Sequence, residues 1–150
     1  MSTIITPELV DLDLPSDDRA AATRALAQRL ADAGRVTDVE GFLADVAARE
    51  QQMPTGLEGG IGIPHARSAH VTVPTLAFGR STAGVDFGAS DGPAHLVFLI
   101  AAPASGDADH MTILATLARR LIHASFRETL LEAGDPEVAA AFITQEVAGS

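Results

Sequence analysis

Apolar residues at helical spacing mark the first part of the chain. They recur every three or four positions over residues 16–33 and again over residues 37–52, which predicts two amphipathic helices. Ser16 is the expected N-cap of the first helix, and Gly34 supplies its stop signal. Thr37 opens a capping box and is the expected N-cap of the second helix.

The middle of the chain changes to the shorter apolar runs that are typical of strands. Strands are predicted over residues 61–63, 73–78 and 96–101, with a short edge strand over residues 85–87. The run over residues 96–101 is continuously apolar, as expected for a strand that helices cover on both faces.

Helical spacing returns after residue 109. Three helices are predicted over residues 110–121, 126–133 and 136–143, the last with Asp135 as its N-cap and Pro136 at its first position. Two helices, several strands and three more helices indicate an α/β fold. We expect a small mixed β-sheet flanked by helices on both faces.

The length of 150 residues suits one domain, so a single domain is expected over residues 1–150. The N-terminal residues lack the basic and long apolar regions of a signal peptide. The longest apolar runs, residues 96–102 and 138–143, are far shorter than the stretch of about 20 residues that crosses a bilayer. A cytoplasmic protein without membrane insertion is therefore expected.

Composition narrows the chemistry that the chain can perform. Twenty acidic and ten basic residues give a net charge of −10, which argues against a nucleic-acid-binding protein. All ten basic residues are Arg, so there is no Lys for a P-loop or a Schiff base. There is no Cys either, which excludes thiol nucleophiles and thiolate metal sites. Histidines, arginines, carboxylates, hydroxyls and backbone amides remain.

His65 is the first candidate for chemistry. It follows a glycine-bordered strand and is preceded by Pro64, which restricts the backbone entering the histidine. A histidine held in this way can act as a nucleophile or general base near neutral pH. The alternative is a satisfied histidine in a tight turn.

His110 and Arg49 are the other candidates. His110 lies at a predicted helix start, where exposed N–H groups attract an anion, although by position alone a packing role explains it better. Arg49 lies on the apolar stripe of its helix, where a guanidinium needs an anion such as a phosphoryl group. Ordinary compensation of the helix dipole is the alternative for Arg49. Together with His65, the two residues would suit phosphoryl transfer.

At these residues the chain resembles a known family, the fructose/mannitol-type enzyme IIA domains of the bacterial phosphotransferase system. Three spaced motifs carry the resemblance: Arg49-Glu50, Thr55-Gly56 and Gly60-Ile-Gly-Ile-Pro-His65. It extends to residues 4–14, 96–103 and 110–121 and so covers nearly the whole chain. Gly62 departs from the family, which usually has Ala there.

The resemblance implies that His65 is phosphorylated on Nε2 by the phosphohistidine of the histidine-containing phosphocarrier protein, HPr. His65 would then pass the phosphoryl group to a cysteine of enzyme IIB. His110 would hydrogen-bond the phosphoryl oxygens and Arg49 would neutralise their charge, chiefly in the onward transfer. Thr55 could contact the phosphate or only cap its loop, and Glu50 is expected to fix Arg49 or a loop amide. No metal or other cofactor is implied.

Two other functions remain open from the sequence. A regulatory, nitrogen-related enzyme IIA paralogue would carry the same motif and use the phosphorylation state of His65 to control protein partners. A metal-dependent hydrolase would draw on His65, His70, His95 or His110, although their spacing matches no helical zinc site.

Overall fold

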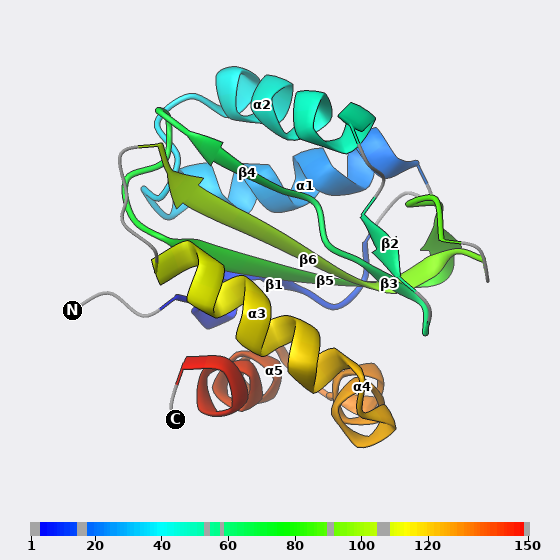
Figure 1. Cartoon of the computed structure of the whole chain (residues 1–150). Helices are drawn as coiled ribbons and strands as arrows, with labels where there is room; N and C mark the ends of the chain where they lie inside the picture. The colour runs from blue at the N-terminus through cyan, green and yellow to red at the C-terminus, as the bar shows by residue number, and fades with distance from the viewer. Residues whose placement is uncertain are drawn as a thin grey trace.

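The computed structural model describes residues 4–14, 18–52, 55–57, 59–89, 92–104 and 109–148, without the side chains of residues 57, 109–114 and 148. These residues form one mixed six-stranded sheet with helices on both faces (Figure 1). The α/β class and the flanked mixed sheet predicted from the sequence are confirmed.

The central strand of the sheet is β6. The strands are β1 (Val10–Asp11), β2 (Gly56–Leu57), β3 (Ile61–Gly62), β4 (His65–Ser68), β5 (Thr75–Val85) and β6 (Ala94–Pro103). Their order is β1-β5-β6-β3-β2, and β4 also pairs with β6. β5 runs antiparallel along one edge of β6, whereas β3 and then β4 run parallel along the other.

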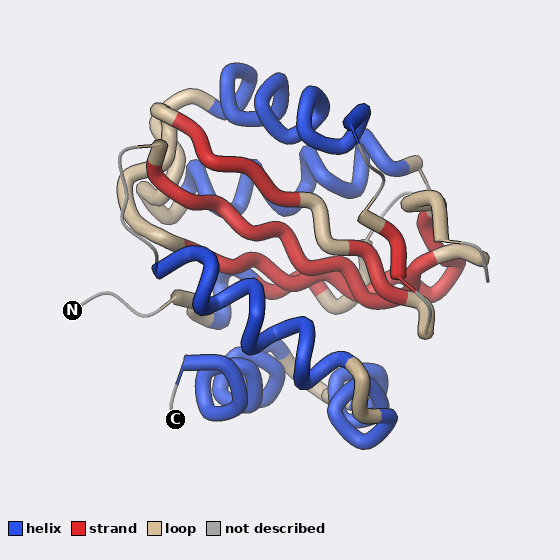
Figure 2. The backbone as a smooth tube through the Cα atoms, in the orientation of Figure 1, coloured by secondary structure: helices blue, strands red, loops and turns tan. Residues whose placement is uncertain are grey.

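Two helical layers enclose this sheet. The helices are α1 (Arg19–Asp32), α2 (Val39–Gln52), α3 (Asp109–Leu121), α4 (Ala124–Glu132) and α5 (Pro136–Ile143), with a 3-10 turn at Pro7–Leu9 and a π-helical turn at Thr144–Ala148. Helices α1 and α2 cover one face, and α3, α4 and α5 lie on the other (Figure 2). None of the described helices is long and apolar enough to cross a membrane.

The continuous apolar run of β6 lies between the two helical layers. Each of its residues from 96 to 101 is at most 4% exposed. The rings of Phe78 and Phe98, on the paired strands β5 and β6, pack with their centroids 5.0 Å apart. The prediction of a strand covered on both faces is confirmed, and this strand forms the middle of the core.

Two predicted helix caps are wrong, in each case because an aspartate beside the helix takes the role. Asp18 caps α1 by accepting a hydrogen bond from Ala21 N, while Ser16 lies outside the described residues. Asp38 accepts from the backbone N–H of Gly41 at the start of α2, and the Thr37 hydroxyl donates instead to the carbonyl of His70. The stop of α1 at Gly34 (φ +78°) and the Asp135 cap of α5 are confirmed.

The strand boundaries also differ from the prediction. The single long strand β5 begins at Thr75, inside the segment expected at 73–78, and ends at Val85, the first residue of the strand expected at 85–87. Residues 86 and 87 are not in a strand, and β5 has an irregularity between Arg80 and Val85. The strands β1, β2 and β4 were not predicted, because runs of two to four residues are too short to show a period.

Arg80 joins the sheet to the second helical layer. Its side chain lies on β5, where Nε donates to the carbonyl of Leu12. Its Nη1 donates to the carbonyls of Leu130, Leu131 and Ala133, at 3.1, 3.1 and 2.8 Å. One guanidinium thus satisfies carbonyl groups at the end of α4 that have no partner within the helix.

We expect Arg80→Lys to destabilise the fold by about 1–3 kcal/mol, because an ammonium cannot reach all of these carbonyls and leaves some of them unpaired. Urea unfolding followed by circular dichroism measures the loss. The control is Arg119→Lys, since Arg119 is exposed and its guanidinium hydrogen-bonds to Thr116 of its own helix. Equal stability of Arg80→Lys and the wild type would contradict this role.

Candidate functional site

His65 lies at a break in the strand that follows one edge of β6. β3 pairs with Leu96 and Val97, and β4 resumes the pairing at Ile100. Pro64 lies in the gap and has no N–H, but its carbonyl accepts a hydrogen bond from Ile100 N at 3.0 Å. His65 was expected at the end of a strand, whereas it is the first residue of β4, half-buried. At this break the chain turns, and the His65 ring points back to the carbonyl of Ile63.

The His65 ring is held by the backbone that precedes it. Nδ1 lies 2.8 Å from the carbonyl oxygen of Ile63. A carbonyl oxygen only accepts, so Nδ1 carries the ring proton. In the neutral imidazole Nε2 then has the free lone pair, and Nε2 is the nitrogen able to attack an electrophile.

A buried carboxylate organises the loop beside His65. Glu50, at the end of α2, is 8% exposed and accepts from both Thr55 N (2.9 Å) and Thr55 Oγ1 (2.7 Å). The expectation that Glu50 binds a loop amide is met by this contact. The Thr55 hydroxyl donates its proton to Glu50, which fits the alternative that Thr55 caps its loop. A phosphate contact by Thr55 stays a prediction.

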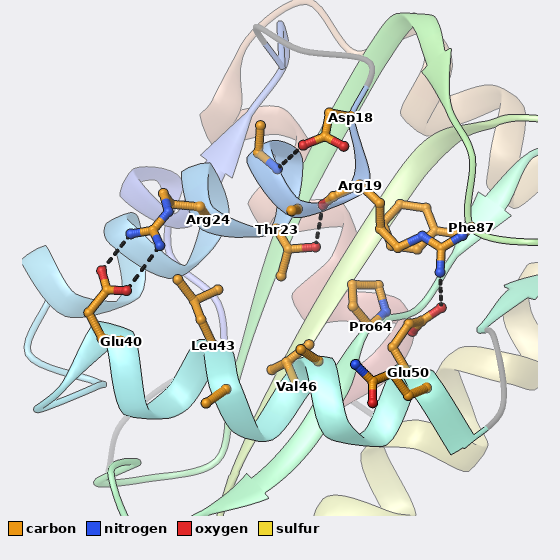
Figure 3. Close-up of a pocket in the computed structure, with 15 residues that line it drawn as sticks. Asp18, Arg19, Thr23, Arg24, Glu40, Leu43, Val46, Glu50, Pro64 and Phe87 are labelled. Atoms are coloured by element: carbon orange, nitrogen blue, oxygen red, sulfur yellow. Dashed lines mark hydrogen bonds and ion pairs between the residues drawn. The ribbon is translucent and has the colours of Figure 1, made fainter.

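Arg19 belongs to this site although no pattern in the sequence pointed to it. It is the first residue of α1, and its Nη1 lies 3.5 Å from Glu50 Oε2. Nε donates to the carbonyl of Asp86 at 2.8 Å, and the guanidinium lies over the Phe87 ring at 5.7 Å from its centroid. Figure 3 shows Arg19 between Phe87 and Glu50. The first position of a helix carries no local signal of these contacts, which come from distant parts of the chain.

Phe87 explains the departure at Gly62. A Cβ built on Gly62 would lie 2.5 Å from the Phe87 ring, so the ring occupies the space that an Ala side chain would need. The Phe87 carbonyl also accepts from Gly56 N at 2.9 Å. Phe87 therefore packs against both glycine-containing segments near His65.

The backbone shows where the other two candidates, Arg49 and His110, lie in the fold. Arg49 is half-buried in the last turn of α2, and its neighbour Glu50 is the more buried of the two. The expectation that Arg49 shares the apolar stripe therefore holds only in part. His110 is the second residue of α3, as predicted, but its side chain lies outside the described residues. The meeting of Arg49 and His110 with His65 stays a prediction.

The contacts that His70, His95 and His123 make among the described residues do not include His65. His95, on β6, has Nδ1 2.8 Å from the carbonyl of Ser81, and His123 precedes α4. His70 follows β4, with Nδ1 3.9 Å from Asp38 Oδ2. Within the part of the chain that the structure describes, no three side chains of the metal-ligating types gather.

A groove of about 800 Å³ runs between α1 and α2 and ends at Pro64 (Figure 3). Two ion pairs join its walls. Arg19–Glu50 lies at the end near His65, and Arg24 binds Glu40 through two hydrogen bonds of 2.6 and 3.0 Å further along the same helices. These hydrogen bonds, together with the attraction of the guanidinium, lower the pKa of the Glu40 carboxyl. The groove therefore extends from the exposed Arg24–Glu40 pair to the Arg19–Glu50 pair beside His65.

The comparisons with known proteins agree with this fold. The domain has the fold of a nitrogen regulatory protein IIA-Ntr from Neisseria meningitidis (TM-score 0.85, 29% identity, covering 94% of this chain and 97% of that one). It also has the fold found in a complex of enzyme IIAMTL and phosphorylated enzyme IIBMTL from Escherichia coli (TM-score 0.77, 23% identity, 97% and 98% covered). The fold is thus that of the enzyme IIA proteins of phosphotransferase systems.

Sequence comparison defines the class further. The family model described as "Phosphoenolpyruvate-dependent sugar phosphotransferase system, EIIA 2" matches residues 3–146. A PTS system fructose-specific EIIA component of Haloferax volcanii is 46% identical over 134 residues, covering 89% of this chain and 87% of the relative. The chain belongs to the EIIA 2 family of the sugar phosphotransferase system. It is accordingly a phosphotransfer component, a transferase, as the sequence resemblance implied.

We expect Gly62→Ala to destabilise the protein by about 1–3 kcal/mol, because the new methyl group displaces the Phe87 ring. The loss is measured by thermal unfolding. Adding Phe87→Leu recovers part of it, since the two changes are coupled. Gly134→Ala is the control, as a Cβ there meets nothing within 4 Å. A Gly62→Ala protein as stable as the wild type would show that the ring moves freely.

Proposed function

We propose that this chain carries a phosphoryl group on Nε2 of His65, as the EIIA component of a fructose-type sugar phosphotransferase system. The observation that carries the proposal is the hydrogen bond between His65 Nδ1 and the Ile63 carbonyl at 2.8 Å. That bond leaves Nε2 as the nucleophile and prevents the ring from turning as the new bond forms.

The phosphoryl group would come from the phosphohistidine of HPr. The Nε2 lone pair forms a nitrogen–phosphorus bond as the bond to the donor histidine breaks, and the donor nitrogen keeps that electron pair. Such transfer depends on positioning and on stabilising the charge of the phosphoryl oxygens. The described residues support the positioning, because hydrogen bonds at Pro64 and Ile63 hold the backbone and the ring of His65.

Enzyme IIB would be the acceptor, through a cysteine. The IIAMTL relative was solved in a complex with phosphorylated IIBMTL, which supports a partner of this kind. The 150 residues contain no Cys, so the acceptor sulfur must lie outside them. In this step the sulfur–phosphorus bond forms as the bond to Nε2 breaks.

Arg49 and His110 are proposed to stabilise the phosphoryl oxygens, with Thr55 as a further contact. Arg49 immediately precedes Glu50, whose carboxylate binds the Thr55 loop, so its place in the chain is next to a fixed part of the site. His110 is in the first turn of α3, where backbone N–H groups favour an anion.

Sugar uptake is favoured over the nitrogen-related regulatory role. The fructose-specific relative is 46% identical to this chain, whereas the nitrogen regulatory protein is 29% identical. The two roles share the fold, so the higher sequence identity is what supports the uptake role.

We expect His65→Ala to lose acid-labile phosphate completely when the protein is incubated with phosphoenolpyruvate, enzyme I and HPr. The nucleophile is then missing, and phosphate on the protein is measured by radiolabelling. His123→Ala is the matched control, because this exposed histidine makes no side-chain cap bond and should be labelled like the wild type. Undiminished labelling of His65→Ala would overturn the assignment.

We expect Arg49→Gln to slow transfer to enzyme IIB by about 100-fold or more, and loading from HPr by less, because charge stabilisation is lost in the onward step. Rapid-quench kinetics separate the two half-reactions. Arg119→Gln, on the exposed side of α3, serves as the control. Wild-type rates in both half-reactions would remove Arg49 from the site.

A further inference from the structure

Glu50 is a carboxylate that the fold has nearly removed from water. Burial of a carboxylate is costly unless hydrogen bonds and a cation compensate for the lost solvent. Thr55 supplies two hydrogen bonds, at 2.9 and 2.7 Å, and Arg19 supplies the cation at 3.5 Å. The arginine comes from α1, a different element from both the α2 helix and the loop that it helps to fix.

A continuous series of contacts leads from this ion pair to the ring of His65. Glu50 binds Thr55, whose carbonyl accepts from Ile63 N at 3.2 Å. The Ile63 carbonyl in turn accepts from His65 Nδ1 at 2.8 Å. The position of the carbonyl that selects the His65 tautomer therefore depends on the position of the loop that Glu50 holds.

Arg19 also fixes the opposite side of the same loop. Its Nε donates to the Asp86 carbonyl, and its guanidinium lies over the Phe87 ring. The Phe87 carbonyl binds Gly56 N, directly after Thr55 in the chain. One side chain thus secures the 55–56 segment twice, through Glu50 and through the 86–87 turn.

We propose that Arg19 is a positioning residue for phosphoryl transfer, which holds His65 as the Nδ1–H tautomer through Glu50, Thr55 and Ile63. The proposal rests on the function proposed for His65. Without Arg19, the Glu50 carboxylate turns toward water in the adjoining groove and the Thr55 loop follows it. The Ile63 carbonyl then leaves Nδ1, and the ring proton moves in part to Nε2, which loses its lone pair.

The Arg24–Glu40 pair provides an internal control for this role. It joins the same two helices across the same groove, and its hydrogen bonds of 2.6 and 3.0 Å are shorter than the Arg19–Glu50 contact. Both of its residues are exposed, and they hydrogen-bond to each other rather than to residues 55–65. If Arg19 only clamped α1 to α2, removing Arg24 would have a comparable effect.

The test is nitrogen-15 NMR of the His65 ring in the unphosphorylated protein, combined with the rate of loading from phosphorylated HPr. We expect Arg19→Ala to convert a measurable fraction of His65 to the Nε2–H tautomer and to slow loading by about 10-fold to 100-fold. Arg19→Lys keeps the charge but not the guanidinium fork, so it recovers only part of both effects. Arg24→Ala leaves the tautomer and the rate as in the wild type.

Two results would overturn the proposal: an unchanged His65 tautomer in Arg19→Ala, or an equal change in Arg24→Ala. If Arg19→Ala does not fold, Glu50→Gln tests the same series of contacts, because its amide cannot accept both hydrogen bonds from Thr55. An unchanged His65 tautomer in Glu50→Gln would also overturn the proposal. The NMR signal reports on positioning even if His65→Ala proves that another residue carries the phosphate, so the two proposals fail separately.

Discussion

The site depends on an interruption in β-sheet pairing. β3 and β4 share one edge of β6, and Pro64 stands where the ladder would otherwise continue. At this break the Ile63 N–H donates to the Thr55 carbonyl, and the Ile63 carbonyl accepts from the side chain of His65, two residues later. The central strand β6 and the local break in its neighbour together fix the His65 ring through a single backbone acceptor.

The exclusive use of arginine as the basic residue has a structural counterpart. Arg80 and Arg127 each donate to carbonyls at a helix end, and Arg120 binds the carbonyl of Glu146. Arg19 combines a carbonyl, a carboxylate and an aromatic ring. Planar guanidinium groups can bridge several acceptors in fixed directions, which a single ammonium cannot do. Arginine thus serves here chiefly as a connector between different elements of the fold.

Much of the fold could be predicted from the sequence because the long helices and β6 have clear periods or continuous apolar runs. The caps at Ser16 and Thr37 were wrong, since a neighbouring aspartate competes for the same role. His65 was found because a proline and several glycines surround it in the chain. Arg19 was missed because its partners lie 31 or more positions away and only the folded chain brings them together.

The bond pattern of Arg80 has a consequence for how the domain comes apart. Its guanidinium belongs to β5 in the sheet, yet its acceptors lie at the end of α4 in the outer layer. Detaching that layer would separate the backbone carbonyls at the end of α4 from Arg80 Nη1 at the same moment. Sheet and outer helices are therefore coupled in a single cooperative unit, and amides of α4 are expected to exchange with solvent only when the sheet opens as well.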